Sequence, residues 1–170
     1  MKNTLVLLAF ILLFSFASCS STKVSSSEVT VGDHNKSDCT FDFGNDVSSG
    51  FTGTAYFRNL VPLDSIYNFP ETNVITFAPD SRSSWHTHGG MYVIGVGGVG
   101  LYQEEGKDAI IIRKGDVIQI PEGVKHWHGG SLSDDFAHIA ANTNPDRPGV
   151  EWFDMLSEED YAKLQDLIQK

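Results

Sequence analysis

The sequence predicts an all-β fold, an antiparallel sandwich or barrel, that ends in one short helix. From residue 51 onward, short runs rich in Val, Ile, Phe and Tyr alternate with turn residues such as Gly97-Gly98 and Pro121-Glu122-Gly123. Runs at this nearly regular spacing are typical of antiparallel sheets and not of alternating strands and helices. A helical pattern is confined to the last residues of the chain.

The first 18 residues predict an export signal. Lys2 precedes an apolar run, Leu5 to Phe16, that is shorter than the roughly 20 residues a spanning helix needs. Small residues then stand before Cys19, as in a bacterial lipobox, whose cysteine is acylated and becomes the new N-terminus. We therefore expect residues 1–18 to be a lipoprotein signal peptide and Cys19 to be lipidated. Ordinary cleavage near Ala17 is the alternative.

Residues 19–48 are expected to form a tether between the lipid and the folded domain. The segment is rich in Ser, Thr, Asp and Asn, which bury little surface. His34 lies in it and is expected to be a solvated linker residue. The predicted location is the bacterial cell envelope, with the protein lipid-anchored at the outer membrane or the periplasmic face. Membrane contact is expected through this anchor only.

Residues 49–155 are expected to form the barrel. The expected strands are Ala55 to Leu60, Asn73 to Phe77, Met91 to Val96, Ala109 to Ile112, Val117 to Ile120 and Phe136 to Ala141. Residues 156–170 are expected to form the helix, with Ser157 as its N-cap and acidic residues in its first turn. Its apolar stripe predicts that it docks on the barrel.

The acidic charge balance disfavours nucleic acid as a partner. The formal net charge is -10, and phosphate backbones are bound by clustered Lys and Arg. A small-molecule substrate is the expected partner.

The histidines form two pairs with the spacing of a metal site. His86 and His88 flank Thr87, and His126 and His128 flank Trp127. On a strand, residues two apart project to the same face, so each pair presents two imidazoles together. Neutral imidazole is a good ligand for divalent Mn, Fe, Co, Ni, Cu or Zn, and one such ion is the expected cofactor. Trp127 is expected to pack on the opposite face.

Two motifs around these pairs resemble those of the cupin superfamily. Trp85-His86-Thr87-His88-Gly89-Gly90 is similar to the first cupin motif, and Gly115 to His126, with Pro121 and Gly123 at fixed offsets, is similar to the second. Further matches extend to the small single-domain bacterial cupins of the (R)-mandelonitrile lyase type. The resemblance implies a single double-stranded β-helix, which is a jelly-roll-like barrel, and a homo-oligomer, a dimer or a tetramer.

The resemblance also implies a set of metal ligands. Carried over, they are His86, His88 and His126, with a Gln or Glu in the fourth position of the family. This chain departs from the family there, because alignment through the glycines places Met91 at that position. Counting from His88 without a gap gives Tyr92 instead. Met91 is the favoured interpretation.

Three further residues acquire expected roles from the resemblance. His128 is expected to be the general base, His138 its partner, and Arg82 a group that stabilises an anionic leaving group or substrate oxygen. The resemblance implies a hydroxynitrile lyase-like enzyme acting on a small oxygenated organic molecule. A three-histidine metal oxygenase and a non-catalytic envelope protein that binds a metal or small ligand are the alternatives.

Overall fold

A computed structural model describes residues 41, 43–47, 49–144, 146 and 149–168. All of them belong to one compact unit, Gly32–Lys170. Cys19, the predicted lipidation site, and His34 lie outside the described residues, as does Cys39. Within the described part, no helix is both long enough and apolar enough to cross a bilayer.

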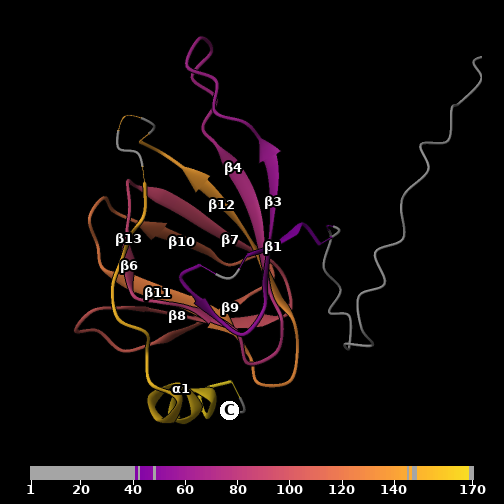
Figure 1. Cartoon of the computed structure of the whole chain (residues 1–170), viewed down its shortest axis with the longest axis vertical. Helices are drawn as coiled ribbons and strands as arrows, with labels where there is room; N and C mark the ends of the chain where they lie inside the picture. Colours follow the sequence, from indigo (N-terminus) through magenta and orange to yellow (C-terminus); the bar gives the residue numbers. More distant parts are fainter. Residues whose placement is uncertain (1–40, 42, 48, 145, 147–148, 169–170) are drawn as a thin grey trace, which may run out of the picture. The chain divides into compact units, whose positions relative to one another are not determined.

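Two antiparallel sheets make up the barrel (Figure 1). The first sheet has the order β1 (Asn45–Val47), β3 (Ala55–Val61), β4 (Thr72–Phe77), β12 (Phe136–Asn142), β7 (Met91–Gly97), β10 (Val117–Ile120). The second has the order β13 (Glu151–Trp152), β6 (His86–Thr87), β11 (His126–Gly130), β5 (Arg82–Ser83), β2 (Phe51–Thr52). On it, β8 (Val99–Glu104) pairs with β11 and with β9 (Ile110–Arg113). The predicted all-β fold with one short C-terminal helix is confirmed.

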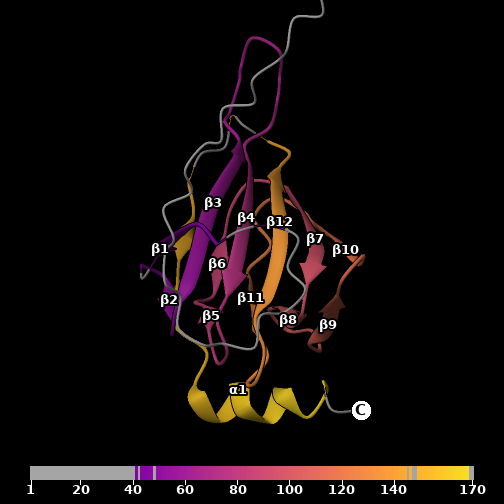
Figure 2. The same ribbon diagram turned by 90° about the vertical axis from the view of Figure 1, so that its right-hand side faces the viewer.

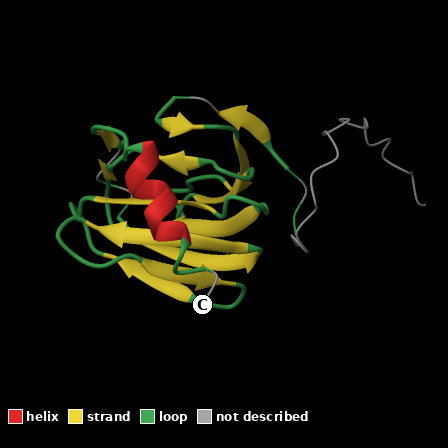
Figure 3. Cartoon of the chain, turned by 90° about the horizontal axis from the view of Figure 1, so that it is seen from below, coloured by secondary structure: helices red, strands yellow, loops and turns green. Residues whose placement is uncertain are grey.

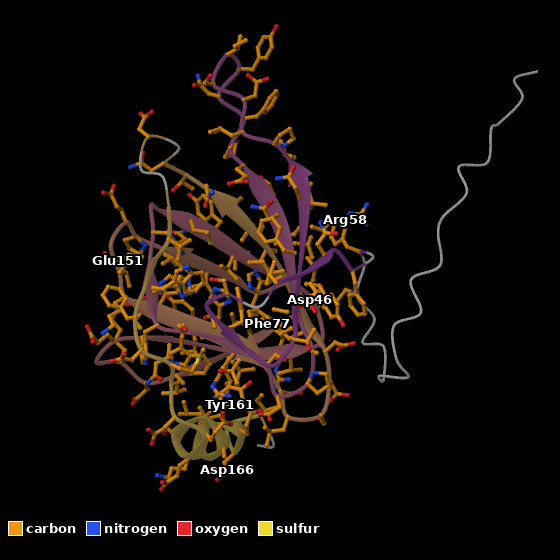
Figure 4. The ribbon with its side chains drawn as sticks, viewed as in Figure 1. Asp46, Arg58, Phe77, Glu151, Tyr161 and Asp166 are labelled. Atoms are coloured by element: carbon orange, nitrogen blue, oxygen red, sulfur yellow. The ribbon has the colours of Figure 1, made fainter. Side chains whose placement is uncertain are left out.

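Successive side chains along each strand point alternately into the barrel and away from it. On β4, Phe77 and Ile75 pack in the main apolar cluster, together with Val93 of β7 and Phe136 of β12. Phe77 is fully buried and lies in the middle of the barrel in Figure 4. Because residues two apart share a face, Asn73 lies on this inward face as well. The inward face of β4 therefore carries the apolar Phe77 and Ile75 and, at its start, the polar Asn73.

Of the described strands, seven lie outside the six runs listed as expected strands: β1, β2, β5, β6, β8, β11 and β13. The expected turn at Gly97-Gly98 is followed directly by strand β8, where Gly100 packs against the ring of Phe136. A side chain there would collide with that ring, so the position requires glycine. Glycine is rare inside strands, and its presence therefore hides the strand from a sequence-based prediction. Strand β1 lies inside the expected tether and pairs with β3, and Val47 packs against the core.

A single helix, α1 (Glu158–Gln165), closes the described chain and lies across one end of the barrel (Figures 2 and 3). Ser157 is its N-cap, as predicted, because its hydroxyl accepts a hydrogen bond from the Asp160 amide at 3.1 Å. Tyr161 is 1% exposed and packs with Leu101 and Trp127. The expected docking of the helix on the barrel is therefore observed, and Tyr161 lies between the two in Figure 4.

Candidate metal centre

Three histidines meet inside the barrel. His86 lies on β6 and His126 is paired with it in register on the neighbouring strand β11, while His88 follows directly after β6. One ring nitrogen from each residue lies within 4.8 Å of the other two. The two strands thus place the imidazoles together because of the pairing His86↔His126, which the local spacing alone does not define.

The second nitrogen of each ring is held by a backbone carbonyl. Nδ1 of His86 lies 2.9 Å from the Ser84 carbonyl oxygen, and Nδ1 of His126 lies 2.9 Å from that of Val124. Nδ1 of His88 contacts the carbonyl oxygen of Gly89 in the same way. A carbonyl oxygen only accepts, so each neutral ring carries its proton on Nδ1 and keeps a lone pair on Nε2. This is the tautomer that a metal ligand needs.

Two of these Nε2 atoms are buried without a partner. Nε2 of His88 and Nε2 of His126 have no hydrogen bond to any described residue. Buried polar atoms are normally satisfied, so unpaired acceptors in one place indicate a group that binds them. Three imidazole lone pairs that face one another are chemically suited to a divalent transition ion. The residues present therefore fit a metal.

Burial keeps these histidines neutral. Loss of solvation, reinforced by the neighbouring His126 ring, lowers the pKa of His86 to about 3. Burial likewise lowers the pKa of His126 to about 4 and also lowers the pKa of His88. All three are therefore unprotonated at neutral pH, which is the state that binds metal ions.

A cavity of about 470 Å³ opens beside this group, a size typical of small-molecule sites. His86, His88 and Met91 line it, and Phe51 and Trp152 contribute aromatic surface. Of the described residues in its wall, none is Lys or Arg, and Glu71 is the single carboxylate. The wall is thus mainly apolar and its described residues include no cationic side chain.

Met91, and not Tyr92, lies on the cavity side of β7. Met91 is half-buried and lines the cavity together with the histidines, while Tyr92 is 43% exposed. Adjacent residues of a strand face opposite ways, so the two cannot both point inward. Met91, the favoured residue, therefore lines the cavity, and its role as a fourth ligand stays a prediction.

His128 and His138 form a second, adjoining pair across the barrel. His128 lies on β11, two residues from His126, and His138 lies on β12 of the other sheet. Nδ1 of His128 and Nε2 of His138 are 3.1 Å apart, and Phe77 packs edge-on against the His128 ring. Burial lowers the pKa of His128 well below its usual value and that of His138 to about 4. His128 also lines the cavity, so the structure brings both predicted residues to the site.

Arg82 is not brought to this group. Its guanidinium donates to the Leu156 carbonyl at 3.0 Å and to Glu158 at 2.8 Å, and it lies 4.4 Å from the centre of the Tyr161 ring. The reason is the alternation of side chains along β5. The next residue, Ser83, faces the cavity and forms hydrogen bonds with the backbone of His128, so Arg82 faces the opposite way. Gly129, paired with Arg82, leaves room for it, since a Cβ there would lie 2.6 Å from that of Arg82. We therefore assign Arg82 to the packing of α1, which corrects the expectation of a catalytic role.

Trp127 packs away from the cavity, as expected, and its Nε1 donates to Gln103 at 3.0 Å. The residue that sequence reasoning missed is Trp152, whose ring centre lies 5.0 Å from that of His86. Its strand pairs with β6 in the register Trp152↔His86, although the two residues lie far apart in the sequence. A two-residue strand at that separation leaves no periodic signal.

Comparisons with known proteins agree with this arrangement. No family model matches the chain. An (R)-mandelonitrile lyase from Granulicella tundricola is 31% identical over 122 residues, which cover 68% of this chain and 93% of that enzyme. The crystal structure of a cupin-like protein from Thermotoga maritima superposes with a TM-score of 0.71 at 37% identity, over 76% of this chain and 98% of that one. A cupin-2 domain from Rhodospirillum rubrum, at 17% identity and a TM-score of 0.53 over 73% of this chain and 79% of that one, has the same fold.

Proposed function

The chain belongs to the cupin superfamily, and from this premise we propose that it is a metal-dependent lyase that cleaves a small, neutral, hydroxyl-bearing organic molecule in the manner of a hydroxynitrile lyase. The observation that carries the proposal is the group of three neutral imidazoles, His86, His88 and His126, beside a mainly apolar cavity. The 31% identity to an (R)-mandelonitrile lyase supports this choice among the many activities of the fold.

The wall of the cavity favours an uncharged substrate with an apolar body. Trp152, Phe51 and Phe57 supply aromatic surface, and no cationic side chain stands among the described lining residues to pair with a carboxylate. A carboxylate on the part of the substrate away from the histidines would be buried without a cationic partner, at a cost of several kcal/mol. Cyanohydrins are neutral and carry one apolar substituent, which matches this wall.

His86, His88 and His126 would hold the ion through Nε2. When bound, a divalent ion supplies Lewis-acid polarisation of a hydroxyl or carbonyl oxygen. The backbone carbonyls of Ser84, Val124 and Gly89 keep the three rings in the ligating tautomer.

We assign the proton transfer to His128. It is neutral at pH 7, lines the cavity, and shares one proton with His138 across the 3.1 Å contact between them. When Nδ1 of His128 donates to His138, Nε2 of His128 keeps a lone pair and accepts the proton of the substrate hydroxyl. The bond between the carbinol carbon and the nitrile carbon then breaks with its electron pair on the nitrile carbon, and the carbonyl double bond forms. Cyanide takes the proton back from His128 and leaves as HCN, so atoms and charge balance.

The experiment is a cleavage assay with two variants. Protein loaded with Mn²⁺ or Fe²⁺ is given (R)-mandelonitrile, and benzaldehyde and HCN are measured. We expect equimolar release of both, and a loss of at least about 100-fold in kcat for His128→Asn, the range that general acid-base catalysis contributes. The variant should retain its metal, because His128 is not one of the three ligands. The matched control is Gln103→Ala, since Gln103 contacts Trp127 on the face away from the cavity.

Absence of HCN from a fully metal-loaded protein would contradict the lyase proposal. Oxygen uptake with metal bound would then support the three-histidine oxygenase, and tight ligand binding without turnover would support a binding protein.

Two further proposals concern the setting of the enzyme. The lipobox-like boundary at Cys19 supports a lipid-anchored protein of the bacterial envelope. The family resemblance supports a homo-oligomer. Both are tested on the intact chain, by membrane fractionation and by light scattering in detergent.

A further inference from the structure

The cavity is larger than a single-ring substrate needs. Its volume is about 470 Å³. An apolar cavity of roughly 150 Å³ is enough to take up benzene, so this one exceeds that by about threefold. A substrate that fills it therefore extends well beyond the ring and the hydroxyl group next to the histidines.

Two hydrogen-bonded polar residues, Glu71 and Asn142, lie in the wall of this cavity. The side-chain amide of Asn142 donates to Oε2 of Glu71 at 3.2 Å, and the Asn142 backbone amide donates to the Glu71 carbonyl at 3.0 Å. Both residues line the cavity. Glu71 precedes β4 and Asn142 ends β12, at the end of the barrel from which the β3–β4 hairpin projects (Figure 1).

Strand register places this group in line with Met91. Asn142 pairs with Met91 of β7, and Glu71 lies on the other side of Asn142, so the three form one row across three strands. Neighbouring strands are 4.7–4.9 Å apart, which puts the backbone of Glu71 roughly 10 Å from that of Met91. The Glu71 carboxylate thus lies on the same wall of the cavity as Met91, two strands away from it.

Asn73 continues the polar wall one row deeper. It is 6% exposed, and its Oδ1 accepts a hydrogen bond from Asn59 at 2.8 Å. This bond fixes the orientation of an amide that also lines the cavity. The wall therefore combines one carboxylate with two oriented amides, Asn73 and Asn142.

We infer that Glu71, Asn73 and Asn142 form a second subsite, which binds a hydrogen-bond-donating group, an ammonium or a hydroxyl, at the end of an elongated aromatic substrate opposite its reacting hydroxyl group. The acceptor is the Glu71 carboxylate. The chain's net charge of -10 and the absence of Lys and Arg from the described lining both favour a cationic or neutral group over an anionic one. The inference rests on the proposed function only for the identity of the reacting end.

Ligand binding tests this with a matched series of alcohols. The probes are benzyl alcohol, 4-(aminomethyl)benzyl alcohol and 4-(hydroxymethyl)benzoate, which share the reacting end and differ at the far end. Dissociation constants are measured by calorimetry on metal-loaded protein. We expect the amine to bind at least about tenfold more tightly than benzyl alcohol, the effect of one hydrogen bond to a charged group, and the benzoate to bind more weakly.

Two variants and one control isolate the carboxylate. Glu71→Gln should remove the advantage of the amine and leave the affinity for benzyl alcohol unchanged, which also shows that the variant is folded. Glu71→Lys should reverse the order, with the benzoate now preferred. Glu105→Gln is the control, because Glu105 pairs with Lys125 at 2.7 Å and is not part of the cavity wall.

Equal affinity of the parent protein for the three probes would overturn the subsite, as would equal weakening of all three by Glu71→Gln. These outcomes are separate from failure of the proposed function. A preference for the amine without HCN release would support the subsite and contradict the lyase proposal. HCN release without that preference would support the lyase proposal and contradict the subsite.

Discussion

Replacing Arg82 with methionine should weaken the attachment of α1 to the barrel and leave the candidate metal centre intact. The arginine is fully buried, and its Nη2 bonds the Leu156 carbonyl and Glu158 at the start of the helix. Its guanidinium also lies over the ring of Tyr161 at 4.4 Å. Methionine keeps most of the apolar stem and removes the charge and the donors.

The size of the effect follows from these contacts. The bond to the Leu156 carbonyl is worth about 1.5–3 kcal/mol, as a hydrogen bond from a charged donor. The bond to Glu158 adds about 0–1 kcal/mol because that side chain is 72% exposed, and the ring contact adds about 1–2 kcal/mol. Against this, Nε and Nη1 of Arg82 are buried without a hydrogen bond to any described residue, and removing them recovers about 1–3 kcal/mol. With the middle of each range, the net expectation is a loss of about 2 kcal/mol in the free energy of unfolding.

Urea unfolding followed by tryptophan fluorescence measures this change, together with metal content and turnover. We expect Arg82→Met to be destabilised, with metal content and kcat close to those of the parent. Glu158→Gln is the control and should change stability by less than about 1 kcal/mol. Unchanged stability of Arg82→Met with loss of turnover would refute the reasoning, because Arg82 would then act on the substrate.

Three other predictions address the ligand at position 91, the neutral histidines and the N-terminus. Met91→Gln should strengthen the binding of Mn or Fe, because an oxygen ligand is harder than a thioether, while Tyr92→Phe should leave it unchanged. Titration of metal-free protein with Mn or Fe measures both affinities. Unchanged affinity in Met91→Gln would make Met91 a packing residue. The free energy of unfolding of metal-free protein should decline as the pH falls from 6.5 toward 4, by about 1.4 kcal/mol per pH unit for each neutral histidine. Burial holds the pKa of His86 at about 3 and that of His126 at about 4, so the unfolded chain is protonated first. A urea midpoint that stays constant from pH 7.5 to pH 5 would contradict this. Cys19→Ala should release the protein from the membrane fraction or leave unprocessed precursor, and an unchanged distribution and mature mass would exclude lipidation.

The candidate metal ligands could be predicted because their signal is local. Alternation around Thr87 and Trp127 places each histidine pair on one face, and the turn residues of the second motif mark where β11 begins. The same alternation predicted that Trp127 packs outside, against Leu101 and Tyr161. The family alignment, with or without a gap after His88, limited the choice at the fourth position to Met91 or Tyr92.

The rest of the cavity could not be predicted because it depends on strand register. Asn142 bonds Glu71 across 71 residues, and Trp152 reaches His86 through a pairing of two short strands. Arg82 lies on a strand of two residues, too short to show which face its side chain takes. The hydrogen bonds of Arg82 to the Leu156 carbonyl and Glu158 show that its side chain lies toward α1, and the pairing of Arg82 with Gly129 leaves space for it.

The central claim, that His86, His88 and His126 together hold a divalent ion, is tested most directly by elemental analysis of protein purified without added metal. The parent should contain about one transition-metal ion per chain, as a single three-imidazole site requires. His86→Ala, His88→Ala and His126→Ala should each lose most of it, because removing one of three ligands greatly weakens binding. His34→Ala should lose none. Full metal content in two of the three variants, or a parent that neither contains nor takes up a divalent ion, would contradict the account.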